Sequence, residues 1–280
     1  MAISYEQQWG KIMTGPEDGT ESKWSALVLA GSRPAGDPLA EHFGAKAKAL
    51  IDFGGKPMLA HVVATLNATP QIARVVVIAQ QTTQLEAAVA QGGGATLRTS
   101  GGGISASIAA LAGSDALPFP ILVTTADHPL LLPSMIGEFL NGAGDADVAV
   151  GMVERATMLA RHPENRRTWL KFSDGHWSGA NLFALQSERC LPALELWARA
   201  EQDRKTVWKL FLHFGPWLAL RALTRTIGLA DALQRAGTRL GLKARLVPLS
   251  QAEAAIDVDK PDDHAQALDI WKARKASGQP

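Results

Sequence analysis

Short apolar runs alternate with segments of helical spacing through the first half of the chain, and this alternation strongly constrains the fold. The runs occupy Ser25–Gly31, Ala73–Ala79, Pro120–Asp127 and Ala146–Val153. Each run is continuous rather than alternating apolar with polar, which is typical of parallel strands buried on both faces. The pattern therefore predicts a three-layer α/β/α fold, with a mostly parallel sheet between two layers of helices.

The second half of the chain has a different pattern. Residues Thr168–Leu185 read as a β-hairpin, because Asp174 and Gly175 form a turn signal between two alternating runs. Residues 187–236 are mostly helical in spacing, and a last helix follows Pro261. We therefore expect a C-terminal helical elaboration of the α/β fold.

Domain boundaries and compartment follow from simple features. We expect a loose lead-in at 1–23 and one domain at 24–280, with a basic and aromatic helical insertion at 187–245. The single cysteine, Cys190, excludes an internal disulfide and a cysteine-rich zinc site. The N-terminal residues lack a signal-peptide core, and no apolar run approaches the roughly 18 residues of a membrane span. These features predict a cytoplasmic protein.

Charge is unevenly distributed along the chain. The 280 residues include 28 basic and 27 acidic side chains, and the formal net charge of +1 gives no reason to expect a nucleic-acid partner. The stretch 204–245, by contrast, contains only one acidic residue, Asp231. Its basic residues are Arg204, Lys205, Lys209, Arg221, Arg225, Arg235, Arg239, Lys243 and Arg245. This stretch could pack on the sheet, form a homodimer face, close over a hydrophobic acceptor, or lie peripherally on the inner membrane face, and all four interpretations stay open.

The loop after the first apolar run is rich in glycine and basic residues. Glycines such as Gly31 let backbone N–H groups approach phosphate oxygens, and Arg33 and Lys48 can neutralise the phosphate charge. A helix beginning at Pro57 would add a favourable dipole. The residues alone are equally consistent with an ordinary loop carrying exposed basic side chains. The absence of GxGxxG and GxxxxGK[ST] disfavours a dinucleotide fold and a Walker ATPase.

Two acidic segments are candidates for metal binding. Asp127 follows a buried strand, where a carboxylate is costly unless it is exposed or paired with a cation. Asp257 and Asp259 alternate on a short extended segment, so only one of them can face a site. Mg²⁺ typically binds one or two carboxylates together with substrate phosphates. Alternatively, Asp127 caps a turn, and a solvent-facing Asp257 is slightly preferred.

These motifs in this order resemble the MobA-like nucleotidyltransferases, within the larger GT-A-like group. The likeness is carried by LAGSR from Leu29, KALIDFGGKPML from Lys48, ADHP from Ala126 and DVDKPDD from Asp257. It covers residues 26–153 and the closing segment. The loop SRPAGDPLAEHFGAKAK is longer than usual and lacks the family's RMG step and DK pair, so a molybdenum-cofactor substrate does not follow.

The resemblance assigns roles to individual residues. It implies that Leu29, Ala30, Gly31 and Ser32 bind the nucleotide phosphates and that Arg33 and Lys48 are catalytic. It implies a base contact at Gly101 and Ser107, where the residues alone favour a flexible loop with a helix cap. It implies Mg²⁺ ligands at Asp127 and Asp259, and acceptor contacts at Arg167, Lys171 and Asn181.

The reaction implied by the resemblance is transfer of a nucleoside monophosphate. An NTP, with CTP preferred by analogy, would react with a phosphorylated small-molecule or lipid-like acceptor and release pyrophosphate. A GT-A-like glycosyltransferase is one alternative, although ADHP stands where such enzymes carry DxD. A non-catalytic nucleotide-binding protein is another.

Overall fold

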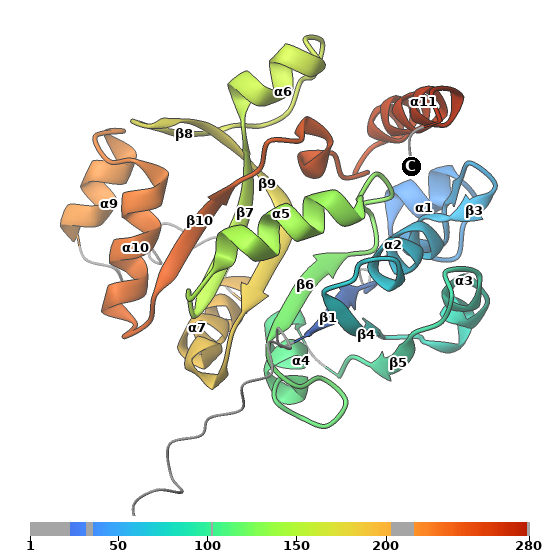
Figure 1. The fold of residues 1–280 in the computed structure, drawn as a ribbon, viewed down its shortest axis with the longest axis horizontal. Helices are drawn as coiled ribbons and strands as arrows, with labels where there is room; N and C mark the ends of the chain where they lie inside the picture. Colours follow the sequence, from blue (N-terminus) through green and yellow to red (C-terminus); the bar gives the residue numbers. More distant parts are fainter. Residues whose placement is uncertain (1–22, 32–35, 102, 203–215, 279–280) are drawn as a thin grey trace, which may run out of the picture.

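One large sheet organises the chain in a computed structural model that describes residues 23–31, 36–101, 103–202 and 216–278 (Figure 1). Within these residues the sheet has eight strands. Seven lie in the order β10 (Ala244–Pro248), β7 (Val148–Glu154), β9 (Gly175–Leu185), β6 (Ile121–Thr125), β1 (Trp24–Leu29), β4 (Ile72–Ala79) and β5 (Thr96–Thr99), and β8 (Leu170–Phe172) pairs with β9. All pairs are parallel except those of β9, which runs antiparallel to β6, β7 and β8. The mostly parallel sheet predicted from the apolar runs is confirmed.

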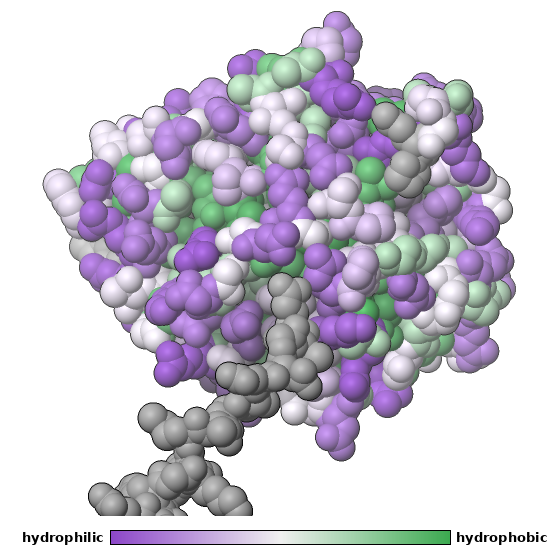
Figure 2. All heavy atoms as spheres, viewed as in Figure 1, coloured by the Kyte–Doolittle hydropathy of each residue, from purple (hydrophilic) through white to green (hydrophobic). Residues whose placement is uncertain are grey.

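Helices cover both faces of the sheet and complete the three layers. On one face α2 (Met58–Asn67) and α5 (Pro133–Ala143) pack on the larger core cluster, which α11 (Pro261–Ala276) joins. On the other face lie α4 (Ile104–Leu111) and α7 (Leu191–Gln202). Strand alternation separates the two cores, because Ala26 and Val28 of β1 enter the first and Leu27 enters the second. Figure 2 shows mostly hydrophilic residues over the visible surface, with hydrophobic residues in small areas between them.

Shorter elements connect these layers. They are α1 (Pro38–His42), the 3₁₀ helix η2 (Lys48–Leu50), the strand pair β2 (Asp52–Phe53) and β3 (Lys56–Pro57), η3 (Thr83–Leu85), α3 (Glu86–Gln91), α6 (Arg155–Arg161), η4 (Glu188–Cys190), α9 (Pro216–Leu223), α10 (Leu229–Arg239) and η6 (Ala252–Ala255). Cys190 is buried in the second core, where it packs as an apolar residue. No helix in the described part of the chain is long and apolar enough to cross a bilayer.

The predicted hairpin is present as β8 and β9. Its turn lies at Ser173 and Asp174, one residue before the expected pair. The carboxylate of Asp174 also accepts hydrogen bonds from the backbone of Leu229 at 2.9 Å and of Ala230 at 3.4 Å. The hairpin therefore caps α10 and is fastened to the helical elaboration.

Backbone hydrogen bonds gather the strand ends that matter for function. Ala30 donates to Ile78 at 2.9 Å, and Ala126 donates to Leu29 at 3.0 Å. Val258 donates to the carbonyl oxygen of Asp127, also at 2.9 Å. The loops after β1, β4 and β6 therefore meet at the carboxyl edge of the sheet, together with the segment that precedes α11. In open α/β sheets this edge is where ligands bind.

Candidate functional site

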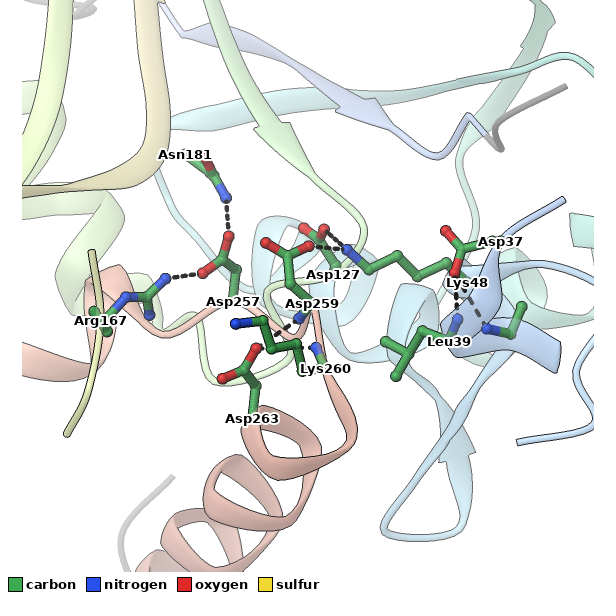
Figure 3. Close-up of polar contacts among 11 residues, drawn as sticks. Asp37, Leu39, Lys48, Asp127, Arg167, Asn181, Asp257, Asp259, Lys260 and Asp263 are labelled. Carbon is green, nitrogen blue, oxygen red and sulfur yellow. Dashed lines mark hydrogen bonds and ion pairs between the residues drawn. The ribbon is translucent and has the colours of Figure 1, made fainter. Parts of the chain in front are cut away.

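Lys48 lies at the centre of this edge, between two carboxylates (Figure 3). Its Nζ donates to Asp127 Oδ2 and to Asp259 Oδ1, each at 2.5 Å. Lys48 begins η2, Asp127 follows β6, and Asp259 precedes α11. Three distant segments therefore bring together the lysine and the two aspartates that the resemblance singled out.

The electrostatics of this group favour a charged lysine. The side chains of Lys48 and Asp127 are 17% and 18% exposed, whereas that of Asp259 is 60% exposed. Burial alone would lower the pKa of Lys48, but the two carboxylates outweigh it and hold that pKa above its ordinary value. The ammonium is therefore the cation that both carboxylates share.

The donor set around Lys48 fits a hard divalent cation. Asp127 Oδ1 is buried and has no hydrogen-bond partner among the described residues, although Oδ2 is engaged. The described chain contains no group of three or more His, Cys, Asp or Glu side chains arranged to hold a metal ion. A metal at Asp127 and Asp259 would need oxygen ligands from water or substrate, which matches the preference of Mg²⁺.

Asp257 faces away from this group, toward a different set of partners. Its carboxylate accepts from the guanidinium of Arg167 and from Asn181 Nδ2, the latter at 3.0 Å. Burial would raise the pKa of Asp257, but the charge and hydrogen bond of Arg167 outweigh burial. The pKa therefore lies below its ordinary value, and the carboxyl group stays ionised. The preference for a solvent-facing Asp257 was therefore wrong. The expectation that Asp257 and Asp259 point in opposite directions is correct, but it does not predict that Arg167 pairs with Asp257.

A cavity of about 550 Å³ opens beside Asp259 and Arg167. Its described wall contains no hydrophobic residue. Both basic side chains, such as Arg166, and carboxylates, such as Asp263, line this cavity. The carboxylate of Asp263 also accepts hydrogen bonds from the backbone N–H groups of Asp259 and Lys260, at 3.1 and 3.0 Å. A wall of this kind suits a ligand with many hydroxyl and anionic groups.

A second cavity, of about 460 Å³, lies between the first loop and the end of β4. Ala30 lines it from the first loop, Ala47 from the residue before Lys48, and Gln80 and Gln84 from the segment after β4. Sequence reasoning missed these glutamines. Their signal was the pair Gln80 and Gln81 directly after a buried strand, followed by Gln84, at the edge where ligands bind. The Lys48 group thus lies between the two cavities.

Other predicted site residues are placed differently. Leu29 ends β1, and Gly31 follows it at a position where a Cβ atom would come within 3.3 Å of the Gln80 amide. Ser32 and Arg33 lie outside the described residues. Lys171 is exposed on β8 and lines neither cavity.

The predicted base-contact pair is also away from the cavities. Gly101 is exposed, whereas Ser107 is buried on α4 and donates to the carbonyl oxygen of Gly103 at 3.0 Å. Its Oγ also lies 2.8 Å from Ser100 Oγ. Neither residue lines the two cavities, and Ser107 serves the start of α4.

Comparison with known proteins adds a family and several similar folds. The family model for the MobA-like NTP transferase domain matches residues 26–213. A hypothetical transferase from Thermus thermophilus is 29% identical with a TM-score of 0.73, over 86% of this chain and 99% of that one. No curated protein matched the chain.

Two more distant structures share the fold. CMP:2-keto-3-deoxy-manno-octonic acid synthetase, solved with CTP, is 14% identical with a TM-score of 0.56, over 90% of this chain and all of that one. The 4-diphosphocytidyl-2C-methyl-D-erythritol synthase of Anaerococcus prevotii is 9% identical with a TM-score of 0.52, at the same coverage of this chain and 100% of its own. At these identities the similarity concerns the fold alone.

Proposed function

The chain belongs to the MobA-like NTP transferase domain family, and on that premise we propose that it transfers a nucleoside monophosphate from an NTP to a phosphorylated acceptor. Pyrophosphate is the second product. The observation that carries the proposal is the group of Lys48, Asp127 and Asp259 between two cavities. One cavity would take the nucleotide and the other the acceptor.

The nucleotide would occupy the cavity next to Ala30 and Ala47. Its phosphates would then lie near Lys48, whose raised pKa keeps it cationic. The amides of Gln80 and Gln84 could bind the edge of a base, since an amide both donates and accepts. The resemblance implies that Arg33 contacts the phosphates, and we propose it as the second catalytic cation beside Lys48. CTP is the first nucleotide to test, because the synthetase of similar fold was solved with CTP.

Asp127 and Asp259 would hold Mg²⁺. A metal ion held there would supply positive charge that offsets the negative charge on the departing pyrophosphate. Lys48, which pairs with both carboxylates, would also stabilise the negative charge that develops on the transferring phosphate. Asp127 Oδ1, which is buried and has no partner in the described part of the chain, supports a further ligand at this point.

The acceptor would enter the polar cavity beside Asp259. Its phosphate oxygen would attack the α-phosphorus, and the bond from that phosphorus to pyrophosphate would break. A phosphate nucleophile is already ionised at neutral pH, so positioning and charge stabilisation suffice and no strong general base is required. We propose a polyhydroxylated phosphate as the acceptor, because the described wall offers hydrogen-bonding groups and no hydrophobic side chain. Arg167, which lines this cavity, is the main proposed acceptor residue. Asn181 lines neither cavity but contacts the same Asp257 carboxylate as Arg167, and Lys171 stays a weaker candidate at the hairpin.

The test is pyrophosphate release from the full chain with each NTP, Mg²⁺ and a panel of sugar and polyol phosphates. We expect release with one nucleotide and one acceptor, and its loss in Asp127→Asn. The control is Asp145→Asn, an exposed carboxylate paired with Lys243 and Arg245. Release unaffected by Asp127→Asn would overturn the site. Transfer of sugar from a sugar nucleotide would support the glycosyltransferase instead, and nucleotide binding without turnover of any pair would support the non-catalytic alternative.

A second proposal concerns the basic and aromatic stretch at 204–245. Its residues 204–215 lie outside the described residues, but α9 exposes Trp217, Leu220 and Leu223 on one face, at 68%, 48% and 81%. Exposed arginines follow at Arg225 and on α10. We propose that this face lies on an anionic lipid surface, since exposed apolar side chains and exposed cationic side chains follow one another along this stretch. Such contact would place the protein peripherally at the membrane.

A further inference from the structure

Asp257 and Asp259 stand two residues apart and serve opposite sides of the site (Figure 3). The Asp259 carboxylate accepts a hydrogen bond from Lys48, whereas the Asp257 carboxylate accepts hydrogen bonds from Arg167 and Asn181. We propose that Asp257 is a positioning residue, which is held by Asn181 and in turn holds Arg167 in the orientation that binds the acceptor phosphate. The inference rests on the proposed function and deepens it, because it assigns Asp257 to the acceptor side and not to the metal.

Both oxygens of Asp257 are already engaged. Oδ1 accepts from Arg167 and Oδ2 accepts from Asn181 at 3.0 Å. The side chains of Asp257 and Arg167 are only 16% and 21% exposed. A metal ion at Asp257 would compete with the cation of Arg167 for the same carboxylate, whereas Asp127 keeps a buried oxygen that has no partner among the described residues. The two carboxylates best placed for a metal are therefore Asp127 and Asp259.

Arg167 connects Asp257 to the acceptor cavity, because it contacts the carboxylate and also lines the cavity. A guanidinium is planar and carries five N–H donors in a fixed fork. A carboxylate bound to one of these donors fixes the plane in which the others point. An arginine held in this way loses less side-chain freedom when it binds a phosphate. Asp257 thus acts on the acceptor through Arg167.

The backbone at Asn181 supports the same assignment. Its φ is +51°, a conformation that non-glycine residues rarely adopt. It lies where the register of β7 and β9 shifts: Val150 pairs with Phe183, but Met152 pairs with Gly179. The bulge brings the Asn181 amide onto Asp257 (Figure 3). Such strained positions are over-represented at functional sites.

The experiment separates acceptor binding from nucleotide binding by calorimetry on the full chain. Glucose 1-phosphate and inorganic phosphate probe the acceptor side, and CTP with Mg²⁺ probes the nucleotide side. The variants are Asp257→Asn, Asp259→Asn and Asn181→Gly, with Asp145→Asn as the surface control. Glycine tolerates positive φ, so Asn181→Gly removes the amide and leaves the bulge. Thermal unfolding checks that each variant is folded.

We expect Asp257→Asn to weaken phosphate-probe binding at least tenfold and to change CTP affinity less than twofold. Asp259→Asn should weaken binding of CTP with Mg²⁺ at least tenfold, because Asp259 contacts Lys48. It should weaken probe binding less than Asp257→Asn does, although Asp259 also lines the acceptor cavity. Asn181→Gly should weaken probe binding about threefold, and it carries the test if Asp257→Asn does not fold. Once an acceptor is known, its KM should rise in Asp257→Asn more than kcat falls.

Three results would overturn the inference. One is equal loss of probe and CTP affinity in folded Asp257→Asn, and another is unchanged probe affinity in that variant. The third is a wild-type protein that binds CTP with Mg²⁺ but neither phosphate probe, which would leave the nucleotide half of the proposed function standing. Failure to bind CTP with Mg²⁺ as well would count against the proposed function itself.

Discussion

The ammonium of Lys48 neutralises two carboxylates at once, and each of them depends on it. Asp127 is largely buried, so its charge needs a cation nearby. Asp259 is more exposed and is tied to the same point by the second 2.5 Å contact. The proposed Mg²⁺ and the ammonium of Lys48 would therefore interact with the same two carboxylates.

Replacing Lys48 should affect catalysis and metal response together. Lys48→Met keeps an unbranched apolar side chain but removes the charge, and we expect kcat to fall by about 100- to 1,000-fold. The two carboxylates would then repel each other, so Mg²⁺ should raise the melting temperature of the variant more than that of wild type. Pyrophosphate release and thermal unfolding with and without Mg²⁺ measure both effects. A wild-type rate would remove Lys48 from the mechanism, and an equal Mg²⁺ response would remove the shared-cation interpretation.

The residues of the site differ in how far the sequence predicts them. Lys48, Asp127 and Asp259 were singled out by the family resemblance, whereas the residues alone left an ordinary loop or turn role equally open for Lys48 and Asp127. Asp257 was misjudged because its partner, Arg167, is remote in the sequence, and ordinary spacing rules say nothing about such pairs. Arg33 remains a prediction, since it lies outside the described residues.

At the level of elements, continuous apolar runs predict the central strands well. The observed β1, β4 and β6 begin and end within about two residues of the predicted runs. The strand β5 (Thr96–Thr99) was missed because it is short and its residues are mostly polar, which is typical of a strand at the edge of a sheet. The double role of Asp174 was also hidden, since a turn signal does not reveal that the side chain caps α10.

The helix α9 gives the element-scale prediction. In Trp217→Ser/Leu220→Ser/Leu223→Ser we expect at least a tenfold loss of binding to vesicles containing phosphatidylglycerol, because the apolar contact is removed. Wild-type binding should weaken with salt and be slight on phosphatidylcholine vesicles. Vesicle co-sedimentation measures these differences.

Ile104→Ser on α4 is the matched control for this variant, since Ile104 is also a large exposed hydrophobic residue, at 43%. It should bind vesicles as wild type does. Light scattering distinguishes a dimer, which would lose mass in the triple variant without any lipid. Unchanged vesicle binding by the triple variant would contradict the surface assigned to α9.

At the scale of the whole molecule, Glu253 joins elements that surround the site. Its carboxylate, 5% exposed, accepts from Arg161 Nε at 2.8 Å and lies 3.0 Å from His162 Nε2. Arg274 of α11 lies 3.5 Å away. The group therefore ties α6 and α11 to η6, which leads directly into Asp257 and Asp259. Removal of one member of such a buried group leaves the others uncompensated.

Glu253→Gln should lower the free energy of unfolding by about 3 kcal/mol at neutral pH, because the buried Arg274 loses its counter-charge. Burial would raise the pKa of Glu253, but Arg161 and its other partners hold that pKa below the ordinary value. The unfolded chain therefore takes up the proton first, and the stabilisation is complete above the ordinary glutamate pKa of about 4.3. As the pH falls further, through the folded-state pKa, the advantage of wild type over Glu253→Gln should shrink. Denaturant unfolding of both proteins at several pH values measures that difference, and a constant difference down to acid pH would contradict a charged Glu253 as the tie between α6, η6 and α11.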